Sequence, residues 1–369
     1  MIISDLPGDL LEEILYRVPA TSVKRLRSVC KRWNRLVNDN RFIRKLLDKA
    51  AKQFLILDLK EFRVFSMSVN LHGIPSIEVI DQLSLNDSQL ISAQSNIGQV
   101  SYCDGLLLCT IKDDDTRRIV VWNPCTGQTK WIHGGDRGKQ SECTSIYTLG
   151  SYQDNKSGNN SYKVLRMICH VVLELEICDI NSNSWRKIDG PGSNILLKFC
   201  SVSLKGKTYW FGKDRNKEHV CLVSFDYERE RFELLFLDPC QFPNVLLKDV
   251  ALSVVREEKL SMLLQRPQAL RKEIWLTSKI DETKAVSWIK VFTVDYPESI
   301  IGFLMGYFLV DEEKKAVLMC CLKWNEPWCK GMSKSIYVVG ENNRVLAEFG
   351  ASHSSRRLYN YVPSLIQFH

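Results

Sequence analysis

The chain has 369 residues, of which 45% are hydrophobic and 25% are charged. These values are those of an ordinary globular protein, and the length is sufficient for one small and one large domain. The longest apolar run, residues 300–310, contains Gly302 and Gly306 and is shorter than the about 20 residues of a membrane span, so it predicts a buried strand. No signal-like leader precedes the first predicted helix, and we expect a protein of the cytoplasm, the nucleus or both, with no membrane partner.

Charge divides the chain into two parts. Residues 1–52 contain 12 Lys and Arg and 6 Asp and Glu, whereas residues 53–369 contain 38 and 37, so the first part carries nearly all of the formal net charge of +7. A basic segment can bind nucleic acid, but here the cations alternate with aliphatic residues rather than with aromatic residues that stack on bases. The pattern favours attraction to an acidic protein surface, and we expect no nucleic-acid partner.

The first part predicts two amphipathic helices separated by a proline. In the first helix the apolar residues recur at the spacing of one helical face: Leu6, Leu10, Leu11, Ile14, Leu15 and Val18. Pro7 suits a first helical turn, Asp9 complements the positive end of the helix dipole, and Pro19 ends the helix. In the second helix the apolar positions are Val23, Leu26, Val29, Cys30 and Trp33, and the opposite face is basic.

A third short helix near residues 40–52 would close this unit, with Phe42, Leu46 and Leu47 facing inward. A unit of this size buries only a small fraction of its surface, so it cannot cover both apolar stripes by itself. We therefore expect the stripes to bind another protein. The alternative is that both helices pack on the rest of the chain.

The two helices resemble the F-box, a motif that binds an adaptor protein. LPGDLLEEILYRVP followed by SVKRLRSVCKRWNRLV carries the family signature at Leu6, Pro7, Leu10, Glu13, Ile14, Leu15, Pro19, Val29, Cys30, Lys31 and Trp33, and Val18 stands where the family has Leu. The resemblance implies docking on a Skp-type adaptor and, through it, assembly with the cullin and RING subunits of a ubiquitin ligase. The residues expected to contact the adaptor are Leu6, Pro7, Leu10, Leu11, Ile14, Leu15, Val18, Pro19, Val23, Leu26, Val29, Cys30 and Trp33.

No motif points to catalysis, a metal or a cofactor. The 13 cysteines form no C-x-x-C pair and stand mostly in apolar runs, which is typical of reduced, buried thiols rather than of zinc ligands. The segment GGDRGK at residues 134–139 is one residue short of the P-loop spacing, and the six histidines are scattered. We expect a non-catalytic protein without catalytic residues, metal ligands or cofactors.

From residue 53 onward the pattern is that of short strands and tight turns. One series of hairpins is IVVWNPCTGQTKWI, LEICDINSNSWRKI, LVSFDYERERFELLF, EIWLTSKIDETKAVSWIKVF and SIYVVGENNRVLAEF, with turns predicted to begin at Asn123, Asn181, Asp226, Asp281 and Asn342. Their recurrence at about 55 residues is in the range of propeller blades. A second series lies between them: VSYCDGLLLC, SYKVLRMI, VSLKGKTYWF, LSVVREEKLSMLL and YFLVDEEKKAVLMC. One hairpin of each series makes a four-stranded blade.

Five such units lie between residues 98 and 349, and the segments 54–67 and 358–368 remain to complete a ring. We therefore predict a mainly β protein with a small α domain at its N-terminus. Residues 1–50 would form the three-helix F-box unit, and residues 51–369 an irregular β-propeller of about six blades, with five to seven allowed. A stacked sandwich is the alternative, because hairpins alone do not establish ring closure.

The β-rich part resembles the F-box associated domain of plant F-box proteins, a kelch-like family of type 1. The resemblance lies in CDGLLLC, VVWNPCTGQTKWI, SLKGKTYWFG, LVSFDYERERF and YVPSLIQF, although the double glycine of true kelch repeats is absent. In that family this domain selects the protein to be ubiquitinated. The resemblance implies a substrate-recognition subunit whose target the sequence does not identify, and a non-ligase interaction scaffold built on a propeller is the alternative.

Tryptophans recur in the predicted strands. We expect Trp122, Trp131, Trp210 and Trp275 to lie in the cores of the blades. Trp324 and Trp328 belong instead to the polar, Pro-containing segment KWNEPWCKG, and propellers carry their functional residues on loops. Because aromatic side chains dominate protein interfaces, these two residues are the candidate target-binding residues.

Overall fold

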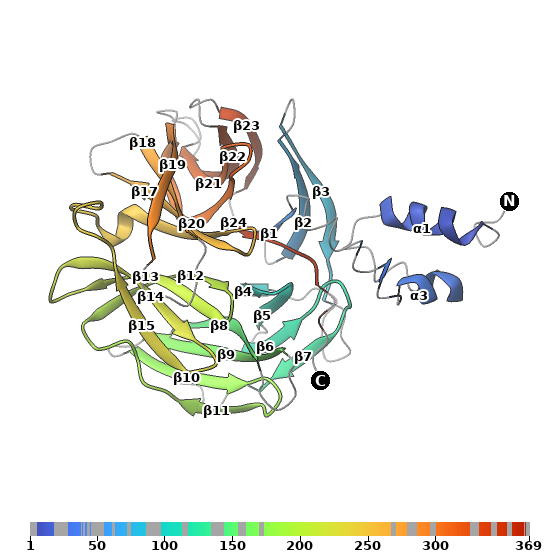
Figure 1. Cartoon of the computed structure of the whole chain (residues 1–369), viewed down its shortest axis with the longest axis horizontal. Helices are drawn as coiled ribbons and strands as arrows, with labels where there is room; N and C mark the ends of the chain where they lie inside the picture. Colours follow the sequence, from blue (N-terminus) through green and yellow to red (C-terminus); the bar gives the residue numbers. More distant parts are fainter. Residues whose placement is uncertain are drawn as a thin grey trace.

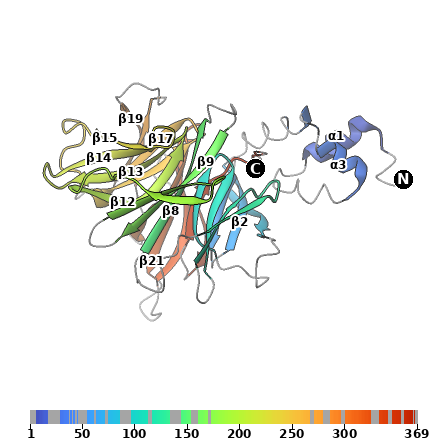
Figure 2. The ribbon, with the colours of Figure 1, turned by 90° about the horizontal axis from the view of Figure 1, so that it is seen from below.

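The computed structural model describes two helices and a ring of sheets. The residues that it describes are 6–17, 29–37, 39, 41–42, 45, 55–60, 63–71, 75–85, 97–112, 117–133, 144–153, 160–169, 173–266, 271–278, 286–295, 300–324, 332–340, 345–352, 356–364 and 366. The helices are α1 (Gly8–Arg17) and α3 (Lys31–Val37). Figure 1 and Figure 2 both show them outside the ring of strands, on the side of the first blade.

The strands form six four-stranded antiparallel sheets, arranged as the blades of a propeller (Figure 1). The first two are β24 (Arg356–Asn360), β1 (Leu55–Lys60), β2 (Arg63–Asn70) and β3 (Ser76–Leu83), and β4 (Ile97–Cys103), β5 (Leu106–Lys112), β6 (Arg117–Trp122) and β7 (Thr129–Ile132). The next two are β8 (Thr144–Gln153), β9 (Asn160–Cys169), β10 (Leu173–Asp179) and β11 (Ser184–Lys187), and β12 (Ile195–Leu204), β13 (Lys207–Asp214), β14 (His219–Asp226) and β15 (Arg231–Phe236). The last two are β16 (Val250–Val255), β17 (Lys259–Gln265), β18 (Arg271–Thr277) and β19 (Trp288–Asp295), and β20 (Ile300–Asp311), β21 (Ala316–Trp324), β22 (Met332–Gly340) and β23 (Val345–Ser352).

The ring is closed by strands from opposite ends of the β-rich part. In the first blade β24 pairs antiparallel with β1, so that Leu57 lies opposite Tyr359, whereas each of the other five blades uses four consecutive strands. This closure confirms the prediction of a propeller with about six blades and is incompatible with the stacked sandwich. The apolar run that begins at residue 300 forms β20, the innermost strand of the last blade.

Tight turns between the outer strands depend on side-chain oxygens that accept backbone N–H bonds. Asn123 Oδ1 accepts bonds from Cys125 and Thr126, and Asp226 Oδ1 accepts bonds from Glu228 and Arg229. Such local bonds stabilise turns and explain why Asn and Asp mark them in the sequence.

The predicted turn at Asn181 is wrong by two residues. Strand β10 ends at Asp179, whose Oδ1 accepts the Asn181 N–H at 2.8 Å, so Asp179 is the residue that begins the turn. Asp281 and Asn342 lie outside the described residues. The preceding segment SYKVLRMI is also longer than predicted, because it forms most of β9, which pairs with β8 along ten residues of each strand.

The cores of the propeller lie between neighbouring blades. Tyr209 and Leu222 of the fourth blade, for example, share one hydrophobic cluster with Met262 and Trp275 of the fifth. Trp122, Trp210 and Trp275 are buried as predicted, while Trp131 is half-buried and lies under the guanidinium of Arg118. Burial between blades makes each sheet depend on its two neighbours for the removal of apolar surface from water.

Candidate functional site

The apolar stripe of the helical unit is divided between an interior and an exposed face. Leu11 and Leu15 are only 2% and 0% exposed, and Phe42 is also buried. On the same helix Leu10 and Ile14 are 52% and 44% exposed, and Val29 just before α3 is 58% exposed. Leu11 and Leu15 are thus buried within the chain itself, whereas Leu10, Ile14 and Val29 are exposed; contact of any of these residues with an adaptor stays a prediction.

Short polar contacts hold this small unit together. The Lys45 ammonium lies 2.7 Å from Glu12 Oε1, and Asp39 Oδ1 accepts backbone bonds from Arg41 and Phe42 at the start of the last helical turn. Phe42 faces inward as predicted, whereas Leu46 and Leu47 lie outside the described residues.

The other predicted adaptor-contacting residues occupy different environments. Pro7 is exposed, Leu6, Cys30 and Trp33 are half-buried, and the Trp33 N–H lies 3.5 Å from Cys30 Sγ. Val18, Pro19, Val23 and Leu26 lie outside the described residues. The structure thus brings three large aliphatic side chains to the surface of the unit, namely those of Leu10, Ile14 and Val29.

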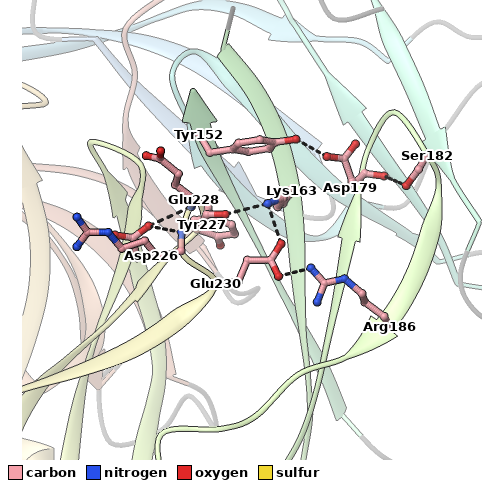
Figure 3. A network of polar contacts seen from close by, with 10 residues as sticks. Tyr152, Lys163, Asp179, Ser182, Arg186, Asp226, Tyr227, Glu228 and Glu230 are labelled. Atoms are coloured by element: carbon pink, nitrogen blue, oxygen red, sulfur yellow. Dashed lines mark hydrogen bonds and ion pairs between the residues drawn. The ribbon is translucent and has the colours of Figure 1, made fainter. Parts of the chain in front are cut away.

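The third and fourth blades are joined by a network of polar contacts (Figure 3). Lys163 on β9 donates a hydrogen bond to the Tyr227 carbonyl at 3.0 Å and pairs with Glu230 at 2.8 Å, and Glu230 also pairs with Arg186. Burial raises the pKa of Glu230, but the hydrogen bonds from Arg186 and Lys163 outweigh this effect and hold the pKa below its usual range. The network joins the turn after β14 to the neighbouring blade.

A shallow hollow of about 530 Å³ lies beside this network, between the outer strands β11 and β15. Its exposed cations already have acidic partners: Arg186 pairs with Glu230, Lys187 with Glu174 and Arg231 with Glu233. Because its charges are balanced, the hollow offers no distinctive attraction for a charged target.

The segment after β24 crosses the turn of the second blade and is fastened there by Asn123. This residue is fully buried, and its Nδ2 donates to the Ser364 and Ile366 carbonyls at 3.0 and 2.9 Å while its Oδ1 accepts two backbone bonds within the turn. One amide group thereby satisfies four backbone groups from two distant parts of the chain.

Replacing Asn123 with Ala should lower the free energy of unfolding of the propeller by about 2 to 4 kcal/mol, because buried donors and acceptors lose their partners. Urea unfolding followed by tryptophan fluorescence measures the change. Asn181→Ala is the matched control, since Asn181 is exposed in the corresponding turn of the next blade, and its effect should stay within about 0.5 kcal/mol. Equal stability of the two variants would contradict the role assigned to Asn123.

The two predicted target-binding tryptophans are not tested by the structure. Trp324 is the last residue of β21, but its side chain is outside what the structure describes, and so is the whole of Trp328. Both stay predictions. No group of three or more potential metal-binding side chains occurs among the described residues, and no described helix is long and apolar enough to cross a membrane.

A feature that the sequence did not reveal is a cavity of about 360 Å³ at the centre of the ring. Residues from all six innermost strands line it, together with Glu257 from the turn after β16. The Tyr102 hydroxyl donates a hydrogen bond to the carboxyl group of Glu257 at one end of this cavity. No local pattern indicates this cavity, because Glu257 stands in a polar turn of ordinary composition.

Comparison with known proteins matches each of the two parts of the chain to a domain family. The F-box domain family model matches residues 3–45, and the F-box associated beta propeller domain model matches residues 55–368. In Arabidopsis thaliana the probable F-box protein At5g47300 is 52% identical over 376 residues, which cover all of this chain and 87% of that protein. The F-box/kelch-repeat protein At3g44120 of the same plant is 46% identical over 387 residues, covering all of this chain and 97% of that protein. The chain therefore belongs to the plant F-box proteins that carry an F-box associated β-propeller domain.

Proposed function

We propose that this protein is the substrate-recognition subunit of a Skp–cullin–F-box ubiquitin ligase. The F-box and the propeller domain together support a substrate-adaptor role in general, and the proposal adds the partners. The observation that carries it is the position of Leu10, Ile14 and Val29, which are exposed on a helical unit that stands outside the propeller. Exposed aliphatic side chains on so small a unit are a docking surface for a partner.

In this proposal the helical unit binds a Skp-type adaptor through Leu10, Ile14 and Val29, and the adaptor connects the chain to the cullin and RING subunits. The basic residues of the first 52 positions steer the unit toward an acidic adaptor surface. The propeller holds the target protein, with Trp324 and Trp328 as candidate anchors. The proposed location is the cytoplasm, the nucleus or both.

The proposed mechanism is proximity, without chemistry in the chain itself. Holding a target next to a ubiquitin-charged enzyme raises the effective concentration of the target's lysines at the reacting centre. Hydrogen bonds of Lys163 and Thr148 of the third blade with Tyr227 of the fourth join neighbouring blades, which supports a propeller that holds the target at a constant distance. The chain thus acts as a non-catalytic subunit.

The double substitution Leu10→Asp and Ile14→Asp tests adaptor docking. Each change removes about 1.5 to 3 kcal/mol of apolar burial and places a charge in the interface, so affinity for a purified Skp-type adaptor should fall at least about 100-fold. Isothermal titration calorimetry with the full chain measures the affinity, and the thermal unfolding of the propeller should be unchanged.

Arg17→Ala is the control, because Arg17 is on the same helix with its side chain 76% exposed and paired only with Glu13 among the described residues. It should leave adaptor affinity within about threefold of the parent chain, which is the scale of a surface ion pair. If the double variant binds the adaptor as tightly as the parent chain does, the ligase role fails and the non-ligase scaffold becomes the better description.

A further inference from the structure

The central cavity of the propeller has apolar walls. The innermost strands of neighbouring blades contact one another around the ring axis, and each contributes side chains to the cavity. The aliphatic part of the lining includes Val100, Ile146, Leu252, Val254, Leu309 and Leu358. A volume of about 360 Å³ is within the range of small-molecule sites, which are mostly apolar and carry a few placed polar groups.

The polar end of the cavity is formed by Glu257 and Tyr102. Glu257 has a φ of 54° in the turn between β16 and β17, and its carboxyl group accepts the hydroxyl proton of Tyr102 across the ring. The neighbouring Arg256 points elsewhere, because its guanidinium pairs with Glu313 at 2.7 Å. The left-handed turn therefore sends the acidic side chain toward the cavity and the basic one away from it.

The described residues that line the cavity include one acidic side chain, that of Glu257. Among the described residues that line the cavity there is no Lys, Arg or His. Burial raises the pKa of the Glu257 carboxyl, and the charge of Asp104 raises it further, whereas the Tyr102 hydrogen bond lowers it. A buried carboxyl group next to a second acidic residue and without a cation is an environment in which a positive ligand is stabilised.

One further polar atom of the lining, Gln99 Oε1, is a buried acceptor without a donor among the described residues. The amide nitrogen of the same side chain, Nε2, donates a hydrogen bond to the Ser145 carbonyl at 3.2 Å, but Oε1 has no hydrogen-bond partner in the described part of the chain. Buried acceptors are normally satisfied, so the lining favours a ligand that donates hydrogen bonds.

We propose that the central cavity binds a small organic cation, an ammonium or amidinium group on an apolar body. The charged group would lie against the Glu257 carboxylate, and the body would cover the aliphatic wall. This site goes beyond adaptor docking and does not depend on it, since the helical unit lies outside the ring. The bound cation would pair with the Glu257 carboxylate at the centre of the ring of blades.

The proposal is tested by titrating the full chain with two cations, phenethylamine and benzamidine. The neutral control is 2-phenylethanol, which has the phenylethyl group of phenethylamine but no charge. Calorimetry should show saturable one-to-one binding of at least one cation, at least tenfold tighter than that of the alcohol. Equal binding of cation and alcohol, or no saturable binding of either cation up to about 10 mM, which corresponds to a binding free energy weaker than about −3 kcal/mol, would overturn the proposal.

Two variants locate the site. Glu257→Gln keeps the size of the side chain and an acceptor for Tyr102, and it should weaken cation binding at least tenfold without changing the binding of the alcohol. Glu258→Gln is the matched control, because Glu258 is the exposed neighbour in the same turn and its change should leave cation binding unaltered. If cation affinity falls equally in both variants, or in neither, the cation does not bind at Glu257 and the proposed site is wrong. Should Glu257→Gln fail to fold, the comparison of cation with alcohol on the parent chain still decides the question.

Discussion

A chain that ends before residue 356 should fail to form a stable propeller. The deletion removes β24, the innermost strand of the first blade, and leaves the edge of β1 without its five paired residues. It also removes Leu358 and Tyr361, which are 3% and 1% exposed, and the carbonyl partners of Asn123. At about 1.5 to 3 kcal/mol for each buried side chain and about 1 kcal/mol for each hydrogen bond, the loss is about 5 kcal/mol or more.

Such a loss equals the whole stability of many domains, so the shortened chain should unfold without a cooperative transition and be digested rapidly by protease. Circular dichroism during heating and limited proteolysis measure both effects. A chain that ends after Ile366 is the control, because it keeps β24 and the contacts of Asn123, and it should behave as the full chain does. A cooperative transition of unchanged midpoint in the shorter chain would show that β24 does not close the ring.

Substituting Gly150 with Ala should disrupt the interface between the third and fourth blades. A Cβ atom at this position would lie 1.9 Å from the Tyr227 ring, which is far below any van der Waals contact. The ring cannot move aside easily, because it is fully buried and its hydroxyl is hydrogen-bonded to Thr148 and Thr208 at 3.0 and 2.9 Å. Overpacking of this kind costs about 3 kcal/mol, and loss of the two hydroxyl bonds adds to it.

The measurement for Gly150→Ala is the free energy of unfolding in urea, together with the thermal midpoint. Gly190→Ala provides the comparison, since its nearest contact would be the flexible Leu175 side chain at 3.3 Å and the residue is exposed. That change should alter stability by less than about 0.5 kcal/mol. If both alanine variants unfold at the same urea concentration, the close approach of Gly150 to Tyr227 does not limit the packing of the blades.

Much of the propeller could be predicted because its signals are local. In the hairpins CDGLLLC and SLKGKTYWFG, for example, Asp104 and Lys205 have a positive φ and each is followed by a glycine, and such a turn can be recognised from a few residues of sequence. Strand β3 was not predicted, because its burial pattern does not alternate and no hairpin signature joins it to β2. The pairing of β24 with β1 joins segments from opposite ends of the β-rich part, and a local pattern does not specify which distant strand completes a sheet.

The limits at the candidate sites have physical reasons as well. Helical periodicity shows that one face of α1 is apolar, but it does not show which of these residues the chain itself covers, so it does not separate the buried Leu11 and Leu15 from the exposed Leu10 and Ile14. The cavity was invisible for a different reason. Whether Glu257 or its neighbour Arg256 turns toward the ring axis depends on the backbone of one turn and on Tyr102, which comes from a different blade.

The position of β24 near the end of the chain also determines which part of the protein is complete first during synthesis. A ribosome adds about 5 to 20 residues per second, and domains near the N-terminus are the first to leave it. The N-terminal segment with Leu10, Ile14 and Val29 therefore leaves the ribosome while the ring is still open. The first blade, in contrast, waits for residues 356–360 before its innermost strand exists. In the proposed function, a nascent chain could therefore bind an adaptor before the propeller surface that would hold a target is complete.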